Sequence, residues 1–280
     1  LKAEKKVDTQ TLEVKSARTS TTTANSFNPA VSLILNGQYA NFENEPDDYE
    51  LPGFSLGGES GLGSKGFSLG ESIDDKFYGK ATIGLHNEGG STEVDLEEAY
   101  IQTLGLGHGL TVKAGRFFSA MGYLNEQHTH TWDFADAPLI YRGLFGDQLK
   151  NDGVQVSYIA PTEMFLEFGA EIMSGSSFPG GGEDNGIGAS TVFANIGGDI
   201  GIEHSWQLGL SHWQANDIEG RTSGGHSHGG VGTEETPSFD GESEINALDL
   251  VYKWAPNGNP SNQNFKFQFE YFDRQEDGGI

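Results

Sequence analysis

Apolar and polar side chains alternate with a period of two along most of the chain. In the segment EMFLEFGAEIM, Met164, Leu166 and Phe168 share one face, whereas Glu163 and Glu167 fall on the other. The segment NFKFQFEYFD, near residue 270, alternates in the same way. Because successive side chains of a strand point to opposite faces of the sheet, this pattern predicts β-strands with one apolar face each.

The alternation predicts about eleven strands, and many of them have the 9–12 residues that a tilted strand needs to cross a bilayer. The expected strands cover residues 31–41, 66–73, 75–86, 93–104, 109–117, 152–160, 163–173, 190–197, 204–215, 244–255 and 264–273.

Short and long connections between these strands alternate along the chain. The segments IDDK, GLGHG and APTE make tight links, whereas residues 42–65, 118–151, 174–189 and 216–243 form long links rich in Gly, Asp and Glu. This rhythm is typical of outer-membrane barrels, and structureless loops of such length are uncommon in compact soluble domains. A soluble sandwich with an aromatic core is the alternative.

The fold predicted from these patterns is all-β, a transmembrane antiparallel β-barrel. Residues 1–26 are polar and are expected to form a tether, and residues 27–280 are expected to form the barrel. Single-chain bacterial barrels have even strand numbers, so eleven strands favour a fragment of a larger even-stranded porin barrel that is incomplete at its C-terminus.

Charge and composition narrow the function classes. The chain carries 16 basic and 41 acidic residues, a net charge of −25. No basic surface is available for phosphates, so nucleic acid is excluded as a partner, and cations are favoured. Cysteine is absent, which removes thiolate chemistry. No G-x-S-x-G or H-E-x-x-H motif is present, so no catalytic residues and no enzyme activity are predicted.

Three segments carry a family resemblance: VKAGRFFSAMGYLNEQHTHTWDFADAPLIYRGLFG, FSLGESIDDKFYGKATIGL and VDLEEAYIQTLGLGHGLTVKAGRF. Over roughly residues 28–275 the chain resembles bacterial outer-membrane porins of the phosphate-selective porin-like class, and most closely their zinc-regulated subgroup. The resemblance implies a passive channel in the outer membrane of a Gram-negative bacterium, monomeric or homotrimeric, with lipid and small ions or solutes as partners. The few basic residues do not favour phosphate as the solute.

Two H-x-H elements are candidate metal ligands, His128 with His130 and His226 with His228. Residues i and i+2 of an extended segment share a face, so both imidazoles of a pair can reach one ion, and imidazole suits zinc. Two ligands do not complete a tetrahedral zinc site. An ordinary polar loop is the alternative for the second pair, and packing inside a folded loop is favoured for the first. No cofactor is required.

Residues 118–151 are the segment expected to bend into the lumen and narrow it. Its acidic side chains are expected to face basic ones across the bore. The predicted pore-lining residues are Lys113, Arg116, Glu126, Asp133, Asp136 and Arg142.

The function predicted is therefore an outer-membrane porin for passive uptake of small solutes, biased toward cations and linked to zinc. The alternative is a surface-exposed metal-binding, structural or adhesive β-barrel without significant conductance.

Overall fold

The computed structural model describes residues 30–34, 38–40, 54, 61–63, 65–72, 76–88, 91–134, 136–181, 186–222 and 238–280. Strands dominate this part of the chain. The helical elements in it are α1 (Leu139–Phe145) and the short 3-10 turns η2 (Thr129–Thr131) and η3 (Pro256–Gly258). In these residues, none of the helices is long and apolar enough to span a membrane. The predicted tether, residues 1–26, lies outside the described residues.

One antiparallel sheet contains eleven of the described strands, in the order β1-β4-β5-β6-β7-β8-β9-β10-β11-β12-β13. Its strands are β1 (Ala30–Ile34), β4 (Lys65–Ser72), β5 (Phe77–Glu88), β6 (Ser91–Thr103), β7 (Leu110–Phe118), β8 (Lys150–Ile159), β9 (Phe165–Met173), β10 (Ala189–Ile200), β11 (His204–Arg221), β12 (Phe239–Trp254) and β13 (Phe265–Gly279). From β4 to β13, each strand pairs with its neighbours in the chain, as in an up-and-down barrel. The predicted all-β, antiparallel fold is confirmed, as a single curved sheet consistent with part of a barrel.

Several sequence-based strand boundaries were wrong. The strand expected at residues 31–41 is divided, because β2 (Gln38–Ala40) leaves the main sheet and pairs with β3 (Gly61–Gly63). The strands expected to end at residue 215 and to begin at residue 244 are longer, since β11 and β12 continue to pair past Ala215 and Ser243 through an irregular register. Part of the link expected at 216–243 is therefore strand.

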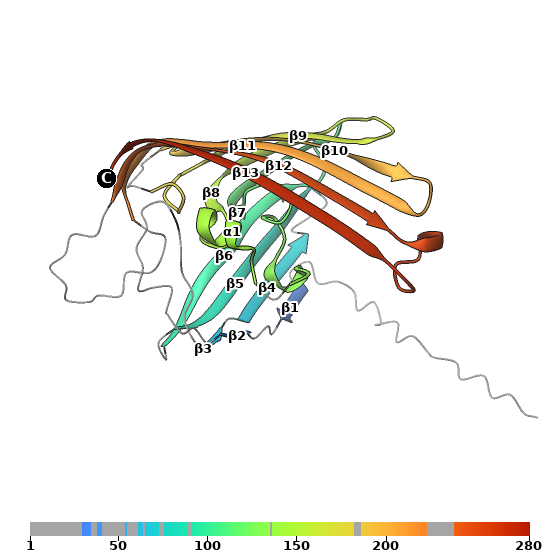
Figure 1. Cartoon of the computed structure of the whole chain (residues 1–280), viewed down its shortest axis with the longest axis horizontal. Helices are drawn as coiled ribbons and strands as arrows, with labels where there is room; N and C mark the ends of the chain where they lie inside the picture. Colours follow the sequence, from blue (N-terminus) through green and yellow to red (C-terminus); the bar gives the residue numbers. More distant parts are fainter. Residues whose placement is uncertain are drawn as a thin grey trace, which may run out of the picture.

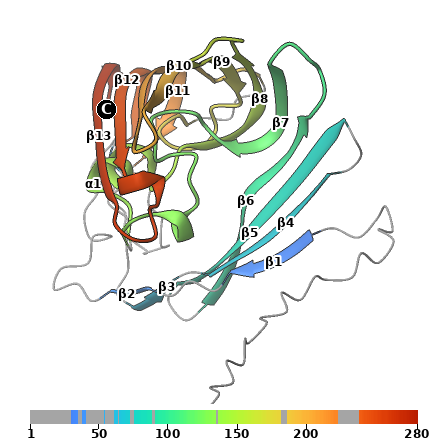
Figure 2. The same ribbon diagram turned by 90° about the vertical axis from the view of Figure 1, so that its right-hand side faces the viewer.

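The sheet is strongly curved (Figure 1). Strands β1 and β4–β6 form one wall and β8–β13 form the other, with β7 between them, and the segment that contains α1 lies in the hollow (Figure 2). We call the side that faces this segment the concave face and the opposite side the convex face.

Strand register sorts the side chains between the two faces. Val154 pairs with Ile172, and both are exposed on the convex face, at 37% and 48%. The next position along β8, Gln155, pairs with Glu171, and both are buried on the concave face. The period-two pattern of the sequence therefore places apolar side chains outside and polar side chains inside.

The buried core lies on the concave face, between the sheet and residues 119–149, which we call the inner loop. Its members come partly from the inner loop and partly from β9–β12. They are Met121, Leu124, Ala137, Tyr141, Leu144, Phe145, Leu149, Met173, Ala189, Trp213, Ala215, Ile218, Phe239, Ile245 and Ala247. Residues 118–151 thus fold inward, as the sequence predicts.

Replacing Ile245 tests whether this core stabilises the protein. Ile245 is fully buried, so we expect Ile245→Ala to lower the free energy of unfolding by about 2–5 kcal/mol through lost transfer energy and the cavity left behind. Chemical unfolding in detergent micelles measures it. The matched control is Ile202→Ala, at a turn position that is 79% exposed. An equal loss of unfolding free energy in both variants would contradict a stabilising role for this core.

Candidate functional site: the inner loop and the concave face

The inner loop is closed at its base by one buried amide. The Nδ2 group of Asn125 donates to the carbonyl oxygens of Ser119 and Leu149, at 2.7 and 2.8 Å, and its Oδ1 accepts from the Leu149 N–H at 2.7 Å. Asn125 has no exposed surface. The two ends of the loop are therefore held together where it leaves β7 and enters β8.

Glu171 of β9 anchors the start of the inner loop. Its Oε2 accepts from the Ser119 hydroxyl at 2.5 Å, and its Oε1 accepts from the Ala120 N–H at 2.9 Å. The neighbouring strand contributes Gln155, whose Nε2 donates to Oε1 at 2.7 Å. Glu171 is 1% exposed, and a buried carboxylate is tolerated only when such donors replace its water. This carboxylate is therefore a structural acceptor.

Glu270 of β13 makes a second anchor on the opposite side of the loop. Its Oε2 accepts from the Tyr123 N–H at 3.1 Å and from the Tyr141 hydroxyl at 2.5 Å. Burial raises the pKa of Tyr141 well above its usual value, with the Glu270 charge acting in the same direction, so the phenol remains a donor. A Cβ on Gly122, where φ is +74°, would lie 2.7 Å from both the carboxylate and the phenol oxygen. The anchor therefore needs glycine there.

A third anchor joins the tip of the inner loop to β5 and β6. Oε2 of Glu98 lies 2.7 Å from both Lys80 Nζ and His128 Nε2, and the ring of His128 meets that of Phe118 edge-on at 5.5 Å. The pairing of β5 with β6 skips Glu97, because Thr82 pairs with Glu98 and Ile83 with Leu96. This irregularity places two consecutive acidic residues near the imidazole, at the kind of site where bulges redirect side chains.

The predicted pore-lining residues are only partly brought together. Lys113 lies 3.7 Å from Glu126, as an inward basic residue facing a loop carboxylate should. Asp133 instead lies 2.5 Å from Lys266 of β13. Asp136 is exposed. Glu126 and Asp133 of the loop therefore meet basic side chains of two strands, β7 and β13, that lie on different sides of the hollow.

The two arginines depart from the sequence-based prediction. Arg116 forms a two-bond pair with Asp152 of β8, at 3.0 and 2.9 Å, rather than with a loop carboxylate. Arg116 lies two residues after Ala114, which pairs with the outward-facing Val154. Because residues two apart on a strand share a face, Arg116 points toward the convex face. Arg142 lies 3.9 Å from Asp147 of the same loop. Sequence reasoning had no means to separate these local partners from partners across the bore.

Glu126 is the loop carboxylate with the most altered chemistry. Its side chain keeps 47% of its surface exposed and lies 3.7 Å from Lys113 Nζ. Desolvation raises the pKa of Glu126 to about 7; Lys113 opposes the shift, and the charges of Glu171, Glu167 and Glu98 add to it. Glu126 therefore changes charge near neutral pH.

The metal candidates are divided between the described and the remaining residues. His226 and His228 lie outside the described residues. His128 contacts Lys80 and Glu98, and His130 lies within η2. Across the part of the chain that the structure describes, no three His, Asp or Glu side chains are grouped so that they could hold a metal ion.

Sequence reasoning did not find Asn125, Glu171 or Glu270. The two glutamates occupy ordinary polar positions of alternating strands. Glu171 is 51 residues, and Glu270 147 residues, from the loop N–H group whose hydrogen bond it accepts. The one local signal was the inner loop itself, which is long and carries apolar residues that a solvent-exposed loop does not need.

No family model matches the chain. The chain is 31% identical over 284 residues to an uncharacterized protein of Aquifex aeolicus (strain VF5), and the alignment covers 90% of this chain and 56% of that relative. The chain therefore spans little more than half the length of the relative.

Among solved structures, the chain is similar to the high-pH structure of Pseudomonas putida OprB. The identity is 14% and the TM-score is 0.36, with 78% of this chain and 63% of that chain covered. The resemblance to phosphate-selective and zinc-regulated porins stays a prediction.

Replacing Glu171 by glutamine tests whether its carboxylate holds the inner loop. The new NH₂ group would face donors from Ala120 or Ser119, so we expect Glu171→Gln to destabilise the loop by about 1–3 kcal/mol and to speed proteolytic cleavage within residues 119–149. Limited proteolysis followed by mass spectrometry measures it. Glu163→Gln, at an exposed turn, is the control; unchanged cleavage in Glu171→Gln would rule out the anchor.

Proposed function

We propose that the protein is an outer-membrane channel for small solutes and ions. The observation that carries the proposal is the polarity of the curved sheet. The convex face exposes Val156, Phe168, Leu210, Phe267 and Phe269, at 42–57%. A water-soluble barrel buries such side chains, whereas a membrane barrel turns them to lipid and keeps the polar ones inside.

The edge of this apolar surface supports a membrane boundary. On β8 and β9 the last apolar residues before the long-loop end are Val154 and Ile172, which pair. On β10 the boundary lies two residues closer to the short turns, because Ile172 pairs with Ser190. On β11 it moves two further, because Val192 pairs with His212. Tilted strands cross a flat bilayer surface with this kind of stepwise shift.

The lumen of the proposed channel is narrowed by the inner loop. Side chains from β5, β6, β7, β9 and β13 hold this segment across the concave face, so it cannot swing aside without breaking several buried contacts. Solutes would pass beside the loop, next to its contacts with the wall that β5–β7 form. Lys80, Lys113, Glu98 and Glu126 gather there, and the acidic excess of the chain favours cations by electrostatic focusing.

Closure of the barrel requires partners for both edges of the sheet. Among the described strands, β1 pairs with β4 alone and β13 with β12 alone. Open edges are not tolerated in lipid. We propose that further strands complete the barrel in the membrane, in line with a relative that is considerably longer than this chain. An adhesive or structural barrel would share this architecture, and conductance separates it from a channel.

Recording across pH tests the channel and its charge together. In planar bilayers we expect the full-length protein to give discrete conductance steps whose cation preference rises between pH 6 and pH 8, because Glu126, with a pKa of about 7, is neutral below that range and negative above it. The reversal potential in a salt gradient measures this preference.

In Glu126→Gln the rise should flatten, whereas the exposed-turn variant Glu163→Gln should keep it. Absence of steps from protein shown to be in the bilayer would favour the structural barrel. If the parent gives conductance steps whose cation preference does not change with pH, the channel proposal stands, but Glu126 does not determine its ion selectivity.

We also propose that an exterior loop captures a divalent metal ion, with zinc the expected ion. The support is the His226 and His228 spacing within a glycine-rich, acidic segment. Micromolar zinc should reduce the conductance of the parent and have a weaker effect on the His226→Ala, His228→Ala double variant. A block equally strong in both proteins would remove this pair as the metal ligand.

A further inference from the structure

Strands β11–β13 change polarity part-way along their length, and they do so on both faces at the same level. The register of these strands defines rows of paired residues. On the convex face the row Leu210–Leu248–Tyr271 is apolar, and the next row toward the long loops is His212–Asn246–Asp273. Across one step of the alternation, the outer surface changes from apolar to polar.

Beyond this step the convex face becomes acidic. Glu244 pairs with Gln275, and Glu242 pairs with Asp277 in the following outward row. Asp240 lies further along β12 and is also exposed. His212 and Asn246 satisfy each other through a 2.9 Å contact between Nδ1 and Oδ1. Charged side chains on the lipid side of a barrel are destabilising, most strongly at the bilayer midplane, so this surface does not suit lipid.

The concave face changes in the opposite sense between the neighbouring rows. Toward the short turns, Asp249 pairs with Glu270, whereas the next inward row toward the long loops pairs Ala247 with Phe272. The row after that contains Trp213 and Ile245, which are fully buried, with Arg274 at its β13 position. Glu276 of the following inward row forms ion pairs with Arg274 and with the buried Arg221. At the level where the exterior becomes polar, the interior is therefore a packed core of apolar side chains with one enclosed ion-pair cluster.

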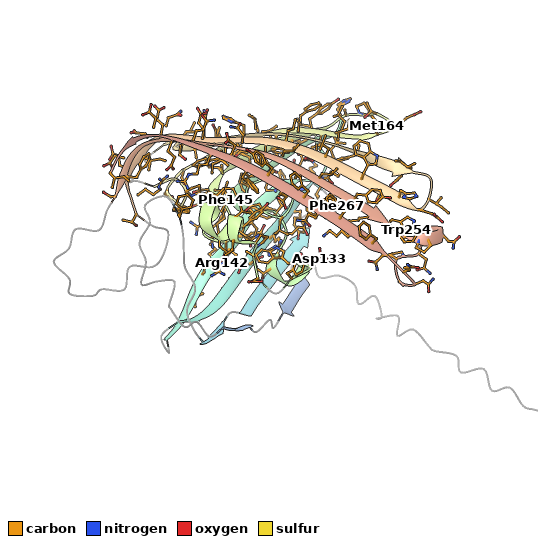
Figure 3. All side chains as sticks on the ribbon, viewed as in Figure 1. Asp133, Arg142, Phe145, Met164, Trp254 and Phe267 are labelled. Atoms are coloured by element: carbon orange, nitrogen blue, oxygen red, sulfur yellow. The ribbon has the colours of Figure 1, made fainter. Side chains whose placement is uncertain are left out.

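The base of the inner loop covers this apolar interior. Tyr141 and Phe145 of α1 meet the ring of Phe272 edge-on, at centroid distances of 5.3 and 5.4 Å. Figure 3 places Phe145 and Arg142 below the long-loop half of the sheet, whereas Trp254 and Met164 lie at the short-turn end. A packed, solvent-excluded interior with an acidic exterior is the arrangement of a water-soluble domain.

We propose that the long-loop halves of β11–β13 stand outside the bilayer and form the wall of an aqueous vestibule, with the inner-loop base as its core. This inference rests on the proposed membrane function. The short-turn halves contact lipid acyl chains, and the bilayer ends near the His212–Asn246–Asp273 row. From Asp273 to Gly279, at about 3.4 Å per residue, roughly 20 Å of β13 then extends beyond the lipid.

The vestibule explains why the inner loop is anchored so firmly. Its base packs as part of a soluble core, so that its position does not depend on the surrounding lipid. Its tip, with His128 on Glu98 and Asp133 on Lys266, reaches the polar part of the interior. One segment is therefore both the core of the vestibule and the constriction of the bore.

Spin labels on single cysteines test this placement. This chain has no cysteine, so each introduced cysteine carries the label alone once any cysteine beyond residues 1–280 of the full-length protein is replaced by serine. The protein is reconstituted in phosphatidylcholine vesicles, and collision of each label with oxygen, which concentrates in lipid, is compared with collision with a water-soluble nickel chelate. The labelled variants are V156C, L210C and Y271C, predicted to face lipid, and E242C, E244C and D277C, predicted to face water.

We expect the first three labels to collide mainly with oxygen and the last three mainly with the nickel chelate, with the reversal between Tyr271 and Asp277 on the same strand. All six positions are on the convex face, so labelling leaves the core intact. Oxygen-dominated collision at E242C and D277C would overturn the vestibule and leave the membrane function standing. Nickel-dominated collision at V156C and L210C would overturn the membrane function and the vestibule with it.

Discussion

The antiparallel hydrogen-bond register is the constraint on which the rest of this structure depends. Because side chains alternate strictly along each strand, one register decides for every pair whether it faces outward or inward. A shift of β9 by one residue against β8 would put Glu171 on the convex face and Ile172 inside, whereas Gln155 and Val154 of β8 would keep their faces. The inner loop would then lose its hydrogen bonds to Glu171, and a charged carboxylate would lie on the apolar outer surface. Register therefore fixes the surface and the interior together.

The inner loop gives this sheet a buried core, because it packs against the concave face. Its N–H and hydroxyl groups are satisfied by carboxylates from strands far apart in the chain, Glu98, Glu171 and Glu270. Each anchor is polar, whereas the base of the loop is apolar and packs on β9–β12. The polar anchors fix where the loop lies, and the apolar packing supplies the stabilisation, since a net contribution of about 1 kcal/mol per hydrogen bond is small beside burial of several large side chains.

The sequence was sufficient to predict the strands and the inward fold of residues 118–151, because both follow from local patterns: a period of two, and a long segment with apolar residues. It was insufficient for the long-loop halves of β11 and β12. There the alternation persists, but acidic residues occupy the outward positions, so a search for apolar outer faces ends the strands near Ala215 and Glu244. Partners were also beyond its reach, because the contact of Asp133 with Lys266 joins residues 133 positions apart.

The structure also changes what the acidic composition means. A net charge of −25 gives the impression of a lumen lined with free carboxylates. Several inward carboxylates instead have protein partners. Glu171 accepts hydrogen bonds from Ser119 and Gln155, and Glu98 forms an ion pair with Lys80. Many of the remaining charges on β12 and β13 face outward. In the proposed channel, the field inside the bore therefore depends on few groups, and Glu126 is important among them because its charge changes near neutral pH. Individual inward carboxylates would then adjust with pH the cation preference that the acidic excess favours.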